Sequence, residues 1–101
     1  MTTKELYDII ISRKKNADSQ SYTSSLFAGG LDRIIQKVGE ESVEVVIAAK
    51  NKDRTEFVGE VADLYYHLLV LLAAKDITID EIEQKLAERH AEKTNTKGVS
   101  S

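Results

Sequence analysis

Five carboxylates in the middle of the chain have the residue types and the spacing that could bind a metal ion. They are Glu40, Glu41 and Glu44, followed by Glu60 and Asp63. Both groups lie among valines and leucines, where carboxylates are rarely found unless they are paired or hold a metal. Carboxylate oxygens are the ligands that Mg²⁺ and Mn²⁺ prefer, and protein-bound Mg²⁺ commonly also binds substrate phosphates. The pattern therefore predicts a divalent-cation site that acts on a phosphorylated substrate.

The first group lies on a predicted helix whose polar residues mostly share one stripe. At roughly 100° per residue, Glu40 and Glu44 fall on the same side of this helix. Lys37 and Arg33 extend the stripe, and we predict that they neutralise phosphate charge. Glu41 lies about 100° away from Glu40. We therefore predict Glu40 and Glu44 as metal ligands, and Glu41 either as the general base or as the ligand of a further ion.

The second group lies on the next predicted helix, where Glu60, Asp63 and His67 form another polar stripe. A polar turn at residues 50–53 would fold the two helices into an αα-hairpin and bring the stripes face to face. Glu60 and Asp63 would then complete the metal site. Such like charges raise one another's pKa values and oppose folding unless cations neutralise them. His67 is predicted either as a core histidine paired with a carboxylate or as a substrate contact.

Helical periodicity and the absence of proline predict an all-α, four-helix chain in which this hairpin is central. The Thr2 and Glu5 positions have the spacing of a capping box at the first helix. The serine-rich segment 18–30 is predicted as a long loop with a functional role. Residues 94–101 are expected to be a flexible tail, which leaves 1–93 as one domain. The four expected helices span residues 2–17, 31–51, 52–76 and 78–93.

Composition argues against several other classes of protein. The net charge of −3 argues against binding to nucleic acid or to an anionic membrane. The longest apolar run, "LLVLLAA", is far shorter than the roughly 18 residues of a membrane span. The stretch "MTTKELYDIII" does not have the pattern of a signal peptide, so we expect a cytoplasmic protein. The two central helices are apolar nearly all round, which predicts a helical-bundle homodimer or a higher homo-oligomer.

The carboxylate pattern and its surroundings also resemble a known family. EExxE followed by ExxD is similar to the metal-binding signature of the MazG-like all-α nucleoside-triphosphate pyrophosphohydrolases. Within that superfamily, "SYTSSLFAGGLDRIIQKVGEESVEVVIAAKN", "EVADLYYHLLVLLA" and the later "ERH" resemble phosphoribosyl-ATP pyrophosphohydrolases. Ser42 stands where that family usually has alanine and Tyr65 where it often has leucine, and neither is a ligand position.

This resemblance covers nearly the whole chain and implies an activity. The expected reaction is Mg²⁺-dependent hydrolysis of phosphoribosyl-ATP to phosphoribosyl-AMP and pyrophosphate, the second step of histidine biosynthesis. The resemblance also implies substrate contacts from the loop and from the last helix. These residues are Ser21, Tyr22, Thr23 and Arg89.

Three other functional classes have related sequence features. A housecleaning pyrophosphohydrolase of free nucleotides would carry the same acidic signature. A non-catalytic helical dimerisation adaptor would explain the amphipathic helices but not the carboxylates inside apolar segments. A di-iron carboxylate bundle requires Glu-x-x-His pairs. The chain has none, because His67 follows Asp63 by four residues and His90 follows Glu88 by two.

Overall fold

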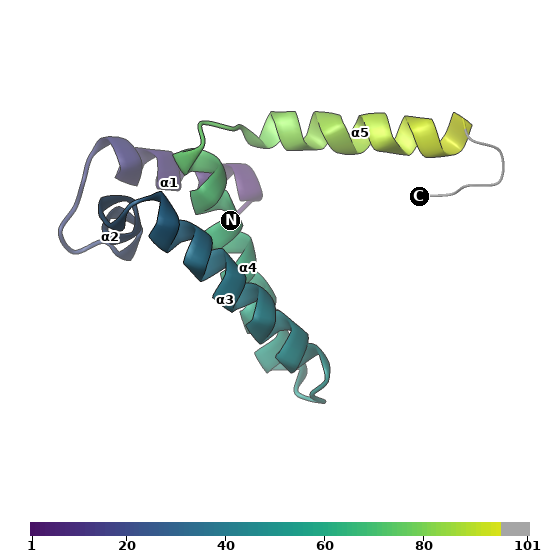
Figure 1. Cartoon of the computed structure of the whole chain (residues 1–101), viewed down its shortest axis with the longest axis horizontal. Helices are drawn as coiled ribbons and strands as arrows, with labels where there is room; N and C mark the ends of the chain where they lie inside the picture. The colour runs from purple at the N-terminus through teal and green to yellow at the C-terminus, as the bar shows by residue number, and fades with distance from the viewer. Residues whose placement is uncertain (96–101) are drawn as a thin grey trace.

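The computed structural model describes residues 1–95, and all the regular structure within that range is helical (Figure 1). The predicted all-α class is confirmed, although the described residues form five helices where four are predicted. Helix α5 continues two residues into the predicted tail, and residues 96–101 lie outside the described residues, so that domain boundary stays a prediction. The helices are α1 (Thr3–Lys15), α2 (Tyr22–Gly29), α3 (Leu31–Ala49), α4 (Arg54–Ala74) and α5 (Ile79–Asn95).

Helix α1 begins at the predicted capping box. The Thr2 hydroxyl accepts a hydrogen bond from the Glu5 N–H at 3.1 Å, and the Glu5 carboxylate accepts one from the Thr2 N–H at 2.8 Å. These two bonds satisfy helix N–H groups that have no partner within the helix. At the other end of α1, the Lys14 ammonium donates to the Ala73 carbonyl at 2.8 Å. This contact fixes the end of α1 against the end of α4.

Helix α2 lies inside the segment that the sequence predicts as a loop. Ser21 caps it by accepting a hydrogen bond from the Ser24 N–H at 3.2 Å. Leu26 is fully buried in the core, and this burial outweighs the low helix propensity of the surrounding serines and threonines. Gly30, with φ of 92°, ends α2 and starts α3. That backbone conformation is one that glycine adopts at little cost.

Helices α3 and α4 form the predicted hairpin and make the most extensive helix-to-helix contact in the described chain (Figure 1). Asp53 caps α4 by accepting a hydrogen bond from the Glu56 N–H at 3.1 Å. The core forms where α1, α2 and the hairpin meet. Its buried side chains are Tyr7, Ile10, Leu26, Ile34, Leu69, Val70 and Ala73.

Helix α5 extends away from the other four helices in Figure 1. The Tyr7 hydroxyl donates to the Ile77 carbonyl at 2.7 Å and ties the connection before α5 to α1. Beyond this point α5 exposes Ile82 and Leu86. An apolar stripe on a helix that projects from the fold lacks the covering that such a stripe normally has.

Helix α4 is long and apolar enough, by length and composition alone, to cross a membrane. The same helix carries Glu56, Glu60 and Asp63 in its first half and packs against α1 and α3. The core helix of a soluble protein passes the same test of length and composition, so this observation is weak support for a membrane span.

Candidate active site

The hairpin brings carboxylates of α3 and α4 together. Glu41 of α3 and Glu60 and Asp63 of α4 each offer an oxygen atom, and these atoms all lie within 4.8 Å of one another. Three carboxylates at this separation can bind one divalent cation through oxygen. The donors are all hard oxygen ligands, which fits Mg²⁺ or Mn²⁺ better than a metal that prefers sulfur or imidazole.

Glu40 lies outside this cluster, which reverses the orientation that the helical wheel predicts. Its side chain is 51% exposed, whereas that of Glu41 is 14% exposed. The Glu40 carboxylate accepts a hydrogen bond from the Gln36 amide at 3.1 Å and lies 3.3 Å from the Lys37 ammonium. These two partners, the amide first, hold the pKa of Glu40 below its ordinary value. Glu40 is therefore paired within α3, and Glu41 is the residue that faces α4.

Glu44 is exposed and contributes charge to the same region. The pKa of Glu60 is raised, first by partial burial and then by the negative charges of Glu44, Asp63, Glu41 and Glu56. The predicted mutual repulsion among the carboxylates is thus present in the folded chain. A bound cation would relieve it.

The two predicted phosphate-binding cations lie on α3 near this cluster. Lys37 is 3.5 Å from Glu41, and its pKa is raised, chiefly by the hydrogen bond to Glu40. Arg33 lies one turn earlier, and its aliphatic stem passes close to Gly29 at the end of α2. Positive charge therefore lies between the acidic cluster and α2.

The predicted substrate residues Ser21, Tyr22 and Thr23 form the cap and first turn of α2. The hydroxyls of Tyr22 and Thr23 contact side chains of α4. The Tyr22 hydroxyl is 3.1 Å from Nε2 of His67. Nδ1 of His67 lies 2.7 Å from the Asp63 carbonyl, which can only accept, so Nδ1 carries a proton. In the neutral imidazole, Nε2 then accepts a hydrogen bond from the Tyr22 hydroxyl. His67 thus links α2 to the backbone of a residue in the acidic cluster.

Tyr66, the neighbour of His67 in the sequence, belongs to the same contact. Its hydroxyl is hydrogen-bonded to the Thr23 hydroxyl. Its ring lies 4.9 Å from that of His67 and 6.3 Å from that of Tyr22. The position of Tyr66 next to His67 was a signal that could have placed it here.

Arg89 is not brought to this region. It lies on α5, which projects away from the hairpin, and its side chain is exposed (Figure 1). A role for Arg89 at the acidic cluster of its own chain is therefore not supported by the described geometry.

These features define a class of protein: an all-α chain whose helical hairpin presents a carboxylate cluster for a hard cation, with basic and hydroxyl groups beside it. The family model for phosphoribosyl-ATP pyrophosphohydrolase matches residues 3–90. The chain therefore belongs to the phosphoribosyl-ATP pyrophosphohydrolase family, which confirms the resemblance seen in the sequence.

Curated relatives are similar over most of their length. The phosphoribosyl-ATP pyrophosphatase of Lacticaseibacillus casei (strain BL23) is 53% identical over 89 residues, which cover 88% of this chain and 81% of that protein. The phosphoribosyl-ATP pyrophosphatase of Methanosarcina acetivorans is 49% identical over 87 residues, 84% of each chain. That of Clostridium novyi (strain NT) is 42% identical over 94 residues, covering 93% of this chain and 86% of that protein.

Proposed function

We propose that this protein hydrolyses phosphoribosyl-ATP to phosphoribosyl-AMP and pyrophosphate, the second step of histidine biosynthesis. Membership of the family and the names of the relatives support the substrate. The observation that carries the chemistry is the cluster of Glu41, Glu60 and Asp63 across the hairpin. Cleavage of a phosphoanhydride needs little covalent chemistry from a protein, because positioning and charge neutralisation dominate.

We propose Glu41, Glu44, Glu60 and Asp63 as the residues that hold Mg²⁺, with Mn²⁺ as the alternative ion. This set replaces Glu40 by Glu41, because Glu41 faces α4 while Glu40 is paired on the exposed side of α3. An ion held by these residues would supply positive charge that offsets the negative charge of the substrate's phosphates. The same geometry favours Glu41 as a ligand over its other predicted role as the general base.

The substrate side of the proposal rests on cations and hydroxyls near the cluster. Lys37 and Arg33 bind phosphate oxygens, and an incoming phosphate would compete with Glu41 for the Lys37 ammonium. Ser21, Tyr22 and Thr23 contact the nucleotide from the first turn of α2. The hydrogen bond between His67 and the Tyr22 hydroxyl fixes the orientation of the Tyr22 side chain. Arg89 would reach substrate only at the site of another subunit, since α5 leads it away from its own.

A homodimer or a higher homo-oligomer is part of this proposal. Apolar side chains remain exposed on both hairpin helices in the single chain, and a second copy would cover them. They include Val43, Val46, Ile47 and Val58. A cytoplasmic location also belongs to the proposal, and it rests on the biosynthetic role of the family.

Pyrophosphate release from phosphoribosyl-ATP, compared with ATP, dATP and dUTP, tests the function. We expect Mg²⁺-dependent release from phosphoribosyl-ATP at a kcat/KM at least about a hundredfold above that for the free nucleotides. Comparable rates on the free triphosphates would instead support the housecleaning alternative. No release from any nucleotide, with a dimer intact, would support the adaptor alternative. Glu60→Gln serves as the inactive control.

A further inference from the structure

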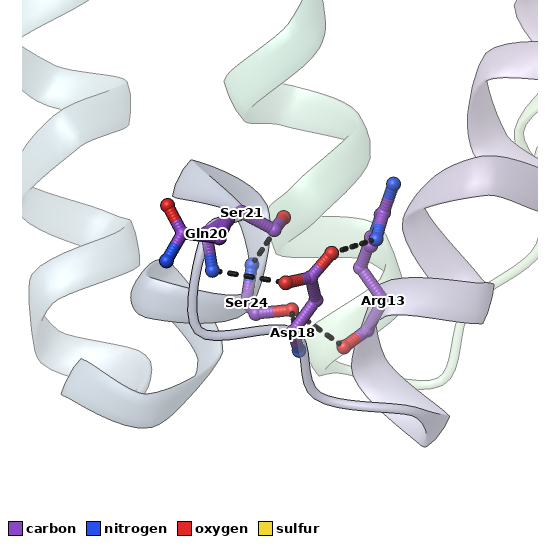
Figure 2. A network of polar contacts seen from close by, with 5 residues as sticks. All are labelled: Arg13, Asp18, Gln20, Ser21 and Ser24. Atoms are coloured by element: carbon purple, nitrogen blue, oxygen red, sulfur yellow. Dashed lines mark hydrogen bonds and ion pairs between the residues drawn. The ribbon is translucent and has the colours of Figure 1, made fainter.

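A polar network centred on Asp18 holds the connection between α1 and α2 (Figure 2). The Asp18 carboxylate accepts hydrogen bonds from the Arg13 guanidinium at 2.8 Å and from the Gln20 N–H at 2.9 Å. The Asp18 N–H donates to the Ser24 hydroxyl at 3.1 Å, and its carbonyl accepts from the Ser21 N–H at 2.9 Å. Asp18 therefore bonds to α1 through Arg13, to the start of α2 through Ser21 and Ser24, and to the connection itself through Gln20.

Ser24 is the buried partner in this network. While its hydroxyl oxygen accepts from Asp18, its proton is donated to the Arg13 carbonyl at 3.2 Å. Arg13 lies in the last turn of α1, where carbonyls lack partners within the helix. The Ser24 N–H donates to Ser21, the cap of α2. Ser24 thus satisfies groups on both helices, and its loss would leave two buried or half-buried groups without these partners.

The element that this network orients is the first turn of α2. An eight-residue helix is too short to be stable alone, so its direction depends on what holds it. Its first turn meets α4 through Tyr22 on His67 and through Thr23 on Tyr66. Figure 2 shows the network on the side of α2 that faces α1, whereas these two contacts face α4. The turn is held from both sides.

We propose that Asp18, Arg13 and Ser24 are positioning residues for the nucleotide subsite on the first turn of α2. The inference rests on the proposed function, in which Ser21, Tyr22 and Thr23 contact the phosphorylated nucleotide. The network fixes this turn before the substrate arrives, so that little ordering is left for binding to accomplish. The side chains of the carboxylate cluster lie on α3 and α4, and the first turn of α2 is linked to them through His67 and the Asp63 backbone carbonyl.

Asp18→Asn and Ser24→Ala test the proposal. Asparagine keeps the size of the side chain and an acceptor for the Gln20 N–H but removes the charge that faces Arg13. We expect the KM for phosphoribosyl-ATP to rise roughly tenfold and kcat to change less than about twofold. The Mg²⁺ concentration that gives half-maximal activity should stay at the wild-type value.

Asp76→Asn is the matched control. It removes an equally short ion pair of 2.8 Å between a loop carboxylate and a basic residue of α1, here Lys14. Asp76 has φ of 56°, a conformation that asparagine also adopts readily. This variant should keep the wild-type KM. An equal rise of KM in Asp76→Asn would overturn the assignment to the Asp18 network.

A second measurement does not depend on turnover. The chain has two histidines, so ¹⁵N spectra of the imidazoles resolve His67, with His90 as an internal reference. In Asp18→Asn the Nε2 resonance of His67 should shift, because its hydrogen bond with Tyr22 weakens, while His90 is unchanged. If Asp18→Asn lowers Tm but leaves the KM and the His67 resonance unchanged, the network only stabilises the fold and the positioning role is wrong. If wild type releases no pyrophosphate from phosphoribosyl-ATP, the proposed function fails, and the His67 resonance still decides the positioning role.

Discussion

At the scale of single residues, Glu40 and Glu41 form a natural matched pair. They are adjacent and identical in chemistry, but only Glu41 lies with Glu60 and Asp63. We expect Glu41→Gln to lower kcat/KM for phosphoribosyl-ATP at least about a hundredfold, as loss of a metal ligand does, and Glu40→Gln to lower it less than about tenfold. Steady-state pyrophosphate release at saturating Mg²⁺ measures both. The opposite ranking would restore the ligand set predicted from the helical wheel.

The different orientations of Glu40 and Glu41 have a simple physical reason. A helical wheel gives the angles between residues, but it does not give the direction in which the neighbouring helix lies. Charge periodicity therefore predicts that α3 and α4 share an acidic region, with Lys37 beside it, but it does not determine which of the two adjacent glutamates faces α4. Packing of α3 on α4 decides that choice, and no local pattern in the sequence encodes it.

The raised pKa of Glu60 gives a pH dependence for the metal-free protein. The folded state holds the Glu60 proton more tightly than the unfolded chain does, because of partial burial and the neighbouring carboxylates. The resulting stabilisation is fully present below the ordinary pKa of 4.5 and is lost as pH rises through the raised value. We expect the free energy of unfolding of wild type to fall relative to that of Glu60→Gln as pH rises.

Urea unfolding in EDTA at a series of pH values between about 4 and 7 measures this difference. The control is Glu5→Gln, because the pKa of Glu5 is lowered and its contribution therefore runs in the opposite direction with pH. A difference between wild type and Glu60→Gln that does not change with pH would contradict the repulsion among the carboxylates.

At the scale of elements, α2 shows how far local sequence predicts structure. Segment 18–30 contains serines that compete for backbone hydrogen bonds, which predicts a loop. The helix forms there because Ser21 caps it and Leu26 reaches the core, and the second of these depends on the tertiary fold. The capping box of α1 and the hairpin turn were predictable, since both depend on residues close together in the sequence.

The hairpin should be stabilised by the ion that it is proposed to bind. If Mg²⁺ binds the folded cluster and not the unfolded chain, a concentration of about a hundredfold above Kd adds about 2.7 kcal/mol to stability. For a domain of this size, that corresponds to a rise in Tm on the order of 10–20 °C. Thermal melts with and without millimolar MgCl₂ measure it, with NaCl of equal ionic strength as the control. Glu44→Gln should show a smaller rise, and equal melts for both proteins in all conditions would contradict the metal site.

At the scale of the whole molecule, the single chain leaves apolar surface uncovered. Residues on α3, α4 and α5 contribute to it, and the fold has too few other helices to cover the hairpin. This agrees with the prediction from the sequence that the central helices are apolar nearly all round. What the sequence could not predict is that α5 projects outward and carries Arg89 away from the acidic cluster of its own chain (Figure 1).

The dimer proposal predicts that a charge placed on the exposed face of α3 will separate the subunits. Val46 is 61% exposed in the single chain. Burying an unpaired glutamate charge there would cost more free energy than the contacts of the interface supply. Light scattering after gel filtration should give wild type a mass of at least twice the 11.3 kDa of one chain, and Val46→Glu a mass near one chain.

The matched control is Ile9→Glu, which changes a 43% exposed apolar residue on α1 and should leave the assembly intact. A monomeric wild type would overturn the dimer, and equal dissociation of both variants would place the interface elsewhere. If each site also needs Arg89 of another subunit, Val46→Glu loses activity when its dimer dissociates. Activity then returns at protein concentrations that restore the dimer.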